Sequence, residues 1–227
     1  MERLIIVLPV LLFSVIAHEY AHGYAALRQG DPTASQLGRL TWNPVKHIDP
    51  FMTLILPVLM AFSNGPILGG AKPVPVNPGN YRHLRRGDII VSLAGVATNL
   101  VIAIGLVPLI FLVGYIAHAS PGLAPGLAIL QAMLIWGVLL NLILVMFNLL
   151  PIPPLDGSHV MKYLLPPTLA VHYQQVGRYG ILILILLLYF GSGVLFFWMS
   201  PAYRAFSLLV VHGRELILPS QWLPLTL

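Results

Sequence analysis

Apolar side chains dominate four stretches of the chain that are each long enough to cross a lipid bilayer. They cover residues 4–27, 89–118, 127–150 and 180–199. A hydrocarbon core about 30 Å thick requires a helix of roughly 20 such residues. A fifth run, 202–218, is shorter and has Arg204 near its start. The pattern therefore predicts a chain of membrane-spanning helices.

A sixth apolar run, 51–62, is too short to span a bilayer, and Pro57 interrupts it. Such a length is typical of a re-entrant or membrane-embedded segment. The stretch 69–80 is rich in proline and valine and is predicted to form an extended edge strand. We expect an all-α polytopic membrane protein with about five to six transmembrane segments and a short membrane-associated β or re-entrant region around 50–82.

The composition excludes a soluble protein. Apolar residues make up 58% of the chain, charged residues 8%, and the mean hydropathy is +0.87, whereas soluble domains are roughly 25% charged. Because there are no cysteines, a disulfide framework, a thiolate nucleophile, an iron–sulfur centre and a cysteine zinc site are also excluded. No internal repeat divides the chain. We expect a single membrane-embedded domain over 1–227, with a core at 1–165 and C-terminal helices at 176–218.

Basic side chains gather on one side of the predicted topology. If 51–62 does not span, only Arg3 and Arg204 of the twelve lysines and arginines lie on the other side. The inner set is Arg28, Arg39, Lys46, Lys72, Arg82, Arg85, Arg86, Lys162, Arg178 and Arg214. The positive-inside rule then places the N-terminus outside and the long loop after the first span in the cytoplasm. The net charge of +5 reflects this orientation and not a nucleic-acid partner.

The first span contains an unusual polar motif, His18-Glu19-Tyr20-Ala21-His22. An ionisable residue inside a transmembrane helix costs about 2.5–3.5 kcal/mol even on insertion scales, so it marks a functional site by default. Residues four apart share a helix face, so His18 and His22 can bind one metal ion while Glu19 acts as a base. This is the H-E-x-x-H pattern of zinc hydrolases. The alternative is a polar cluster that makes hydrogen bonds between helices.

Asp156 is the natural third metal ligand. At 1.5 Å per residue, His18 lies roughly 22 Å along the first helix, in the cytoplasmic half of the bilayer. The third span also runs inward, and Asp156 follows its end, so both parts of the site reach one level. Pro151, Pro153 and Pro154 forbid a continued helix and can aim Asp156 sideways. The alternative is a simple Asp-Gly turn at the membrane surface.

Over residues 14–160 the chain resembles the site-2 proteases, zinc metalloproteases that cut peptide bonds inside membranes. Several motifs stand in the expected order. They are His18-Glu19-x-x-His22; Gly38-Arg39-Leu40-Thr41 with Asn43-Pro44; His47-Ile48-Asp49-Pro50; Ala71-Lys72-Pro73-Val74-Pro75-Val76-Asn77-Pro78; Ala94-Gly95-x-x-x-Asn99; and the stretch from Asn148 to Gly157. One departure is Val96, where the family's usual Ala-Gly-Pro has proline.

The resemblance implies that His18, His22 and Asp156 bind one Zn²⁺ per chain and that Glu19 is the general base. It also implies that the Asn148 amide donates to the oxyanion of the reaction, with hydrogen bonding between helices as the alternative role. The compact form has no room for PDZ or CBS domains. The implied partners are transmembrane protein substrates and the lipid bilayer, with no nucleic acid. The implied location is the plasma membrane, with several spans and the active site toward the cytoplasm.

Two other functions fit parts of this pattern. A catalytically silent homologue would bind membrane helices without cutting them. The presence of all four expected catalytic and metal-binding residues argues against it; they are His18, Glu19, His22 and Asp156. A metal transporter would use the same ligands as a transit site, but the outer halves of these helices lack a polar pathway. Replacing Glu19 by glutamine separates the protease from both, because it should abolish cleavage and leave zinc bound.

Overall fold

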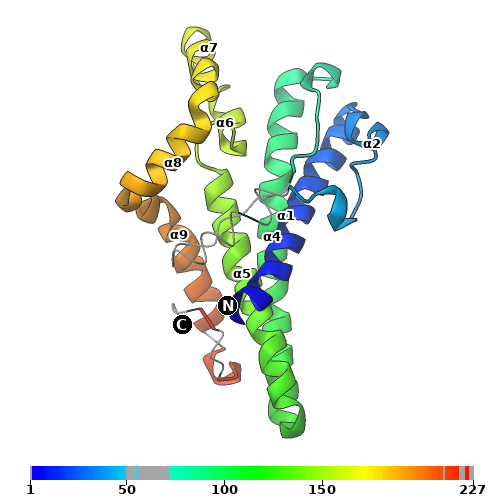
Figure 1. The fold of residues 1–227 in the computed structure, drawn as a ribbon, viewed down its shortest axis with the longest axis vertical. Helices are drawn as coiled ribbons and strands as arrows, with labels where there is room; N and C mark the ends of the chain where they lie inside the picture. Colours follow the sequence, from blue (N-terminus) through cyan, green and yellow to red (C-terminus); the bar gives the residue numbers. More distant parts are fainter. Residues whose placement is uncertain (1, 50–54, 56–71, 212, 220–222, 225–227) are drawn as a thin grey trace.

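The computed structural model describes residues 2–49, 55, 72–211, 213–219 and 223–224 (Figure 1). In this part of the chain the regular structure is entirely helical. The long helices are α1 (Glu2–Gln29), α4 (Leu84–Ala119), α5 (Ala124–Asn148), α8 (Gly180–Phe190) and α9 (Ser192–Val211). The short helices are α2 (Thr33–Gln36), α6 (Asp156–Met161) and α7 (Pro167–Val176). Short 3₁₀ turns lie at Pro44–Lys46, Pro78–Asn80, Pro121–Leu123, Gly177–Tyr179 and Arg214–Leu216.

Five helical stretches are long and apolar enough to cross a membrane, which confirms the predicted all-α polytopic class. They are Ile5–Gln29, Leu84–Ala119, Pro121–Asn148, Pro167–Phe190 and Ser192–Val210. The first three agree closely with the predicted runs. The last two do not, because the predicted helix 180–199 is broken at Gly191. Glycine weakens a helix interior, and here the backbone approaches Leu187 so closely that a β-carbon would lie 2.6–2.8 Å from its atoms.

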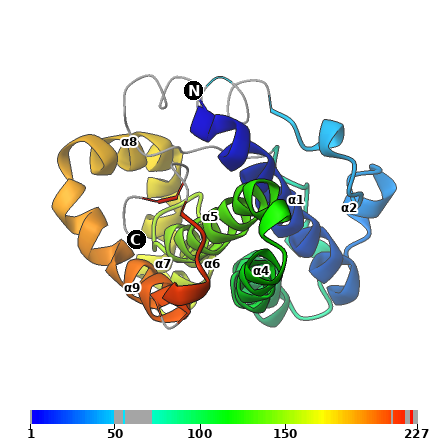
Figure 2. The same ribbon diagram turned by 90° about the horizontal axis from the view of Figure 1, so that it is seen from below.

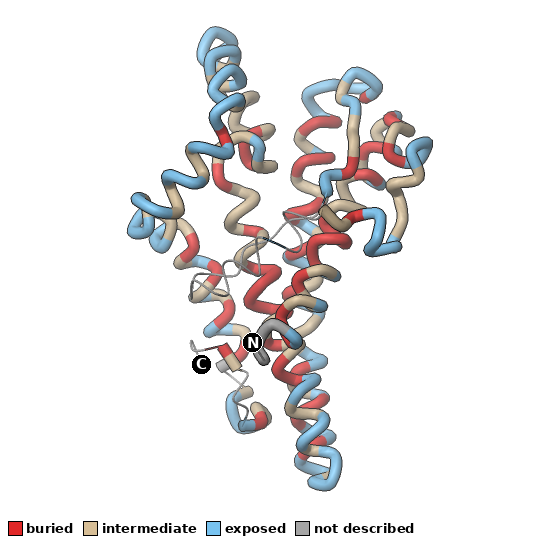
Figure 3. Tube along the Cα trace, in the orientation of Figure 1, coloured by how far each residue is buried: buried red, intermediate tan, exposed pale blue. Residues whose placement is uncertain are grey.

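Helix α5 lies at the centre of the bundle, with α1 on one side and α9 on the other (Figures 1 and 2). Helix α4 leads through the tight turn at Pro121–Leu123 into α5, and the two helices run antiparallel. One apolar cluster joins α4, α5 and α9 and includes Ile110, Ile135 and Phe206. Figure 3 shows the buried positions concentrated where these helices face one another, while α7 and α8 are mostly exposed. Exposed apolar faces of this kind suit contact with lipid.

The end of the chain corrects one topological prediction. Helix α8 begins against the Pro153 carbonyl, which lies 1.7 Å from a β-carbon built at Gly180. By contrast, a β-carbon built at Gly114, near the far end of α4, lies 2.0 Å from the Leu216 carbonyl. The described residues between Gly180 and Leu216 thus pass once from the α6 end of the bundle to the end where α4 joins α5 (Figure 1). Arg214 therefore lies opposite the predicted inner side, where nine of the twelve basic residues remain.

The predicted re-entrant run 51–62 falls outside the described residues, apart from Ile55, and so do residues 69–71 of the predicted edge strand. From Lys72 the chain runs irregularly to the turn at Pro78–Asn80. Within the described residues, this segment is not part of a β-sheet. Pro73 and Pro75 carry no N–H group, which limits the ladder that the segment can form.

Candidate metal centre

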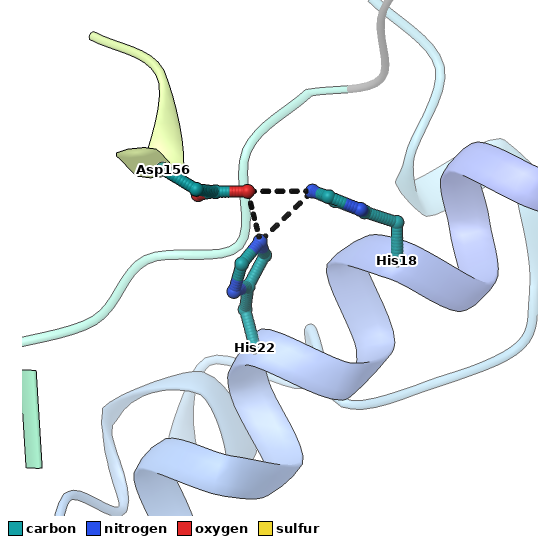
Figure 4. Close-up of side chains that lie close together, drawn as sticks. All are labelled: His18, His22 and Asp156. Atoms are coloured by element: carbon teal, nitrogen blue, oxygen red, sulfur yellow. Dashed lines mark hydrogen bonds and ion pairs between the residues drawn. The ribbon is translucent and has the colours of Figure 1, made fainter. Parts of the chain in front are cut away.

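Three side chains converge between helices α1 and α6 (Figure 4). The Nε2 atoms of His18 and His22 lie 2.9 Å apart. The Oδ2 atom of Asp156 lies 3.2 Å from His18 Nε2 and 3.4 Å from His22 Nε2. Ligand atoms around a tetrahedral zinc with bonds of ~2 Å are about 3.3 Å apart. The structure therefore brings the three predicted ligands together at the spacing that such an ion requires.

The hydrogen bonds behind the rings leave the site rich in lone pairs. His22 Nδ1 lies 2.7 Å from the Val91 carbonyl oxygen, which can only accept, so Nδ1 carries the proton. His18 Nδ1 is bound to the Asn99 side chain. Both Nε2 atoms then face Asp156 as acceptors, and the buried Oδ2 of Asp156 has no hydrogen-bond partner. Three convergent acceptors without a proton between them fit a cation, which supports the zinc assignment.

Glycine at position 95 makes room for the two rings. A β-carbon built on Gly95 would lie 2.5 Å from His22 Nε2 and 2.6–2.7 Å from the His18 ring. Only a residue without a side chain permits α4 to pass so close to the imidazoles. This observation gives a physical reason for the glycine in the motif Ala94-Gly95-x-x-x-Asn99.

The loop between α5 and α6 positions Asp156. Helix α5 ends at Asn148, and α6 begins at Asp156 itself, so the proline-rich stretch breaks the helix as predicted. A β-carbon at Gly157 would lie 2.3 Å from the Leu149 carbonyl oxygen, so glycine lets α6 pack directly on the end of α5. The loop thereby brings Oδ2 of Asp156 to 3.2 Å from His18 Nε2 and 3.4 Å from His22 Nε2.

A buried ion-pair cluster ties α6 to α4. Asp88 is 2% exposed, and its carboxylate accepts from His159 Nδ1 at 3.1 Å and pairs with the Lys162 ammonium. No motif in the sequence indicates this cluster. The cluster holds α6, which begins at Asp156, against α4. Helix α4 contacts the two histidines through Val91, Gly95 and Asn99.

Glu19 faces the segment that follows Lys72. Its Oε2 accepts a hydrogen bond of 2.7 Å from the Val74 backbone N–H. The Arg39 guanidinium donates to the carbonyls of Lys72 and Pro73, at 2.8 and 3.2 Å. The described part of the predicted edge strand therefore lies against Glu19, next to His18.

Asp31 fastens the far end of the same segment. Gly30, in the left-handed region at φ 110°, ends α1 and turns the chain so that Asp31 is buried. Asp31 accepts from the Asn77 backbone N–H at 2.6 Å and from the Asn80 amide at 2.9 Å. The segment is thus held at both ends by side chains from the first part of the chain.

Asn148 makes a different contact from those considered in the sequence analysis. Its amide nitrogen donates to the Leu144 carbonyl of its own helix at 3.0 Å. This bond neither points to the three converging side chains nor joins two helices. An oxyanion role for Asn148 therefore stays a prediction.

Comparison with known proteins points to one group. The model of peptidase family M50 matches residues 116–190. The Bacillus subtilis protein named "Putative zinc metalloprotease YwhC" is 38% identical over 189 residues, which cover 83% of this chain and 82% of that protein. "Putative zinc metalloprotease Rip2" of Mycolicibacterium smegmatis is 35% identical over 185 residues, 81% of this chain and 66% of its own length. No solved structure matches the chain.

Proposed function

This chain belongs to peptidase family M50, the zinc-dependent site-2 proteases, and on that basis we propose that it is an intramembrane endopeptidase. It hydrolyses peptide bonds in or near the transmembrane helices of other membrane proteins. The observation that supports this most directly is the convergence of His18 Nε2, His22 Nε2 and Asp156 Oδ2 beside Glu19. Three acceptors that face one another in an apolar helix bundle are costly unless a cation lies between them.

His18, His22 and Asp156 hold the zinc ion in this proposal. When bound, zinc supplies a Lewis acid that acidifies water and polarises the scissile carbonyl. Glu19 takes the proton of the attacking water and returns it to the leaving amine. The Val74 N–H fixes Oε2 of Glu19, which leaves Oε1 to carry that proton.

The substrate helix has to unwind locally, because an intact helix engages its carbonyls in hydrogen bonds. We propose that the segment 72–77 receives the unwound strand by strand addition. Its support is the contact between Val74 and Glu19, together with the anchoring by Arg39 and Asp31. Arg39→Ala should slow cleavage, and Lys46→Ala is the matched control, because Lys46 binds the Gly38 carbonyl of the same loop. Equal cleavage by the two variants contradicts a role for the segment.

The test of the function uses detergent-purified chain and a panel of single-span membrane peptides with glycine or proline in the span. New termini are detected by mass spectrometry. The native chain should cut some of these peptides, and Glu19→Gln should bind zinc and cut none. Cleavage by Glu19→Gln at the native rate contradicts the proposed mechanism. Zinc binding without cleavage of any peptide by the native chain favours the catalytically silent homologue.

The proposed orientation is that of the positive-inside rule, with the N-terminus outside and the metal centre toward the cytoplasmic face of the plasma membrane. The position of nine basic residues on the inner side supports it. The proposed organisation is a single domain, since α5 contributes to two apolar clusters, one shared with α4 and α9 and the other with α1.

A further inference from the structure

A chain of buried polar side chains leads from His18 into the centre of the bundle. Asn99 of α4 and Asn141 of α5 are 0% exposed, and Ser14 of α1 is 1% exposed. Each comes from a different helix, and each is costly in an apolar interior unless it is hydrogen-bonded. Asn141 and Ser14 belong to none of the motifs in the sequence analysis, and the catalytic steps above make no use of them.

Backbone carbonyls fix the donor and the acceptor of each hydrogen bond in this series of buried side chains. The Asn141 amide nitrogen donates to the Gly137 carbonyl at 2.8 Å and to Ser14 Oγ at 2.8 Å. The Ser14 hydroxyl donates in turn to the Val10 carbonyl at 2.8 Å. Because a carbonyl oxygen only accepts, the Asn141 amide cannot be flipped without losing a bond. Its Oδ1 therefore faces Asn99.

The same logic continues to the metal centre. The Asn99 amide nitrogen donates to Asn141 Oδ1 at 2.7 Å and to the Ser14 carbonyl at 3.3 Å. Asn99 Oδ1 is then turned to His18 Nδ1, 2.5 Å away. Since Oδ1 only accepts, Nδ1 has to carry the proton, and the lone pair of His18 is at Nε2, which faces Asp156.

Helix α4 presents these contacts at a spacing of four residues along one face. Val91 accepts from His22 through its carbonyl, Gly95 leaves space for both rings, and Asn99 accepts from His18. A helical carbonyl points toward the residue four positions later, so the missing side chain of Gly95 also keeps the Val91 carbonyl open to His22. One helix face thus sets both imidazoles.

We propose that Asn99 is the positioning residue of the zinc ligand His18, and that Asn141 and Ser14 hold its amide in the orientation that selects the Nδ1–H tautomer. The inference rests on the proposed metal site. A ligand histidine needs its free lone pair on the nitrogen that faces the ion, and the hydrogen bond of the other nitrogen sets which one that is. Asn99, Asn141 and Ser14 thus set the tautomer of His18 before zinc binds.

The test compares zinc affinities of the full-length chain in detergent, measured by competition with a chromophoric chelator. Asn99→Ala removes the acceptor and should weaken zinc binding by about 10- to 100-fold, the usual effect of losing such a partner. Asn99→Asp keeps an acceptor for His18 and should bind closer to the native chain. Gln131→Ala is the matched control, because Gln131 is an equally buried amide on α5 that binds Ile110 and Leu216 instead. It should leave the zinc affinity unchanged.

A spectroscopic readout separates positioning from general stability. The visible spectrum of the Co²⁺-loaded chain should change in Asn99→Ala and stay native in Gln131→Ala. The ¹⁵N resonances of His18 in the metal-free native chain should show the Nδ1–H tautomer, a measurement that needs no variant to fold. An Nε2–H tautomer in the native chain overturns the proposal, and so does native zinc affinity in Asn99→Ala.

His18→Ala distinguishes failure of this inference from failure of the proposed metal site. If His18→Ala binds zinc like the native chain, the ligand set itself is wrong, and the positioning role falls with it. If His18→Ala loses zinc while Asn99→Ala matches Gln131→Ala, the metal site stands and only the role of Asn99 is refuted.

Discussion

Replacement of Gly95 by alanine is the sharpest perturbation that the metal centre offers. The new β-carbon would lie 2.5 Å from His22 Nε2, 2.6 Å from His18 Cε1 and 2.7 Å from His18 Nδ1. These separations are about 1 Å shorter than the ~3.5 Å of an ordinary contact. Ligand distances in a metal site tolerate changes of about 0.2 Å. The rings therefore have to leave their ligating positions.

The size of the effect follows from the cost of overpacking. Extra atoms in a packed core cost about 1–3 kcal/mol. If that cost falls on the metal-bound geometry, zinc binding weakens by about 5- to 150-fold, at 1.4 kcal/mol per factor of ten. Alanine also has a higher helix propensity than glycine. Gly105→Ala in α4 controls for this gain, because a β-carbon at Gly105 meets no atom within 4 Å.

The assay is the chelator competition on purified Gly95→Ala and Gly105→Ala. We expect weakened zinc binding in the first and native binding in the second, with both chains folded by thermal unfolding. Native zinc affinity in Gly95→Ala would show that the two rings do not need the space beside α4, and the reason given for a glycine at position 95 would be refuted.

Three further predictions address the surroundings of the site. Asp88→Asn should lower the unfolding temperature and expose α6 to proteolysis, because it removes the charged partner of Lys162. Removing one partner of a fully buried ion pair costs ~3–5 kcal/mol, and the effect here is smaller since Lys162 reaches solvent. Burial raises the pKa of Asp31, but its hydrogen bonds from Asn77, Thr33 and Asn80 lower that pKa below the ordinary value. The contribution of Asp31 to stability is therefore complete above about pH 4 and is lost as the pH falls through the folded-state pKa. Proteolysis of 72–80 should rise on acidification, and Asp31→Asn should remove that pH dependence. Single cysteines in this cysteine-free chain should react with an impermeant reagent from outside at Gly122 and from the cytoplasm at Arg178; the reverse labelling contradicts the orientation.

Much of the site could be predicted from the sequence because its signals are local. His18 and His22 are one helical turn apart, and Glu19 lies between them in an apolar helix. Asp156 follows prolines that had to end α5. Counting residues from the membrane surface was enough to place these side chains at one depth.

The interhelical contacts could not be predicted in this way. Whether Asn99 meets His18 depends on the rotation of α4 about its axis, which an apolar run does not specify. The pairing of Asp88 with His159 depends on where α6 docks, which no local signal in the sequence specifies. The break at Gly191 was missed because the apolar run continues through it, and the position of Arg214 was wrong for the same reason.

Zinc content per chain tests the central claim most directly. It should be measured by atomic absorption on the native chain, His18→Ala and Asp156→Ala, each purified in detergent and shown to be folded. The account predicts about one zinc in the native chain, as expected for a single three-ligand site, and a loss or marked weakening in both variants. A folded native chain without zinc above background, or variants that keep it fully, would contradict the proposed metal centre and the proteolytic function built on it.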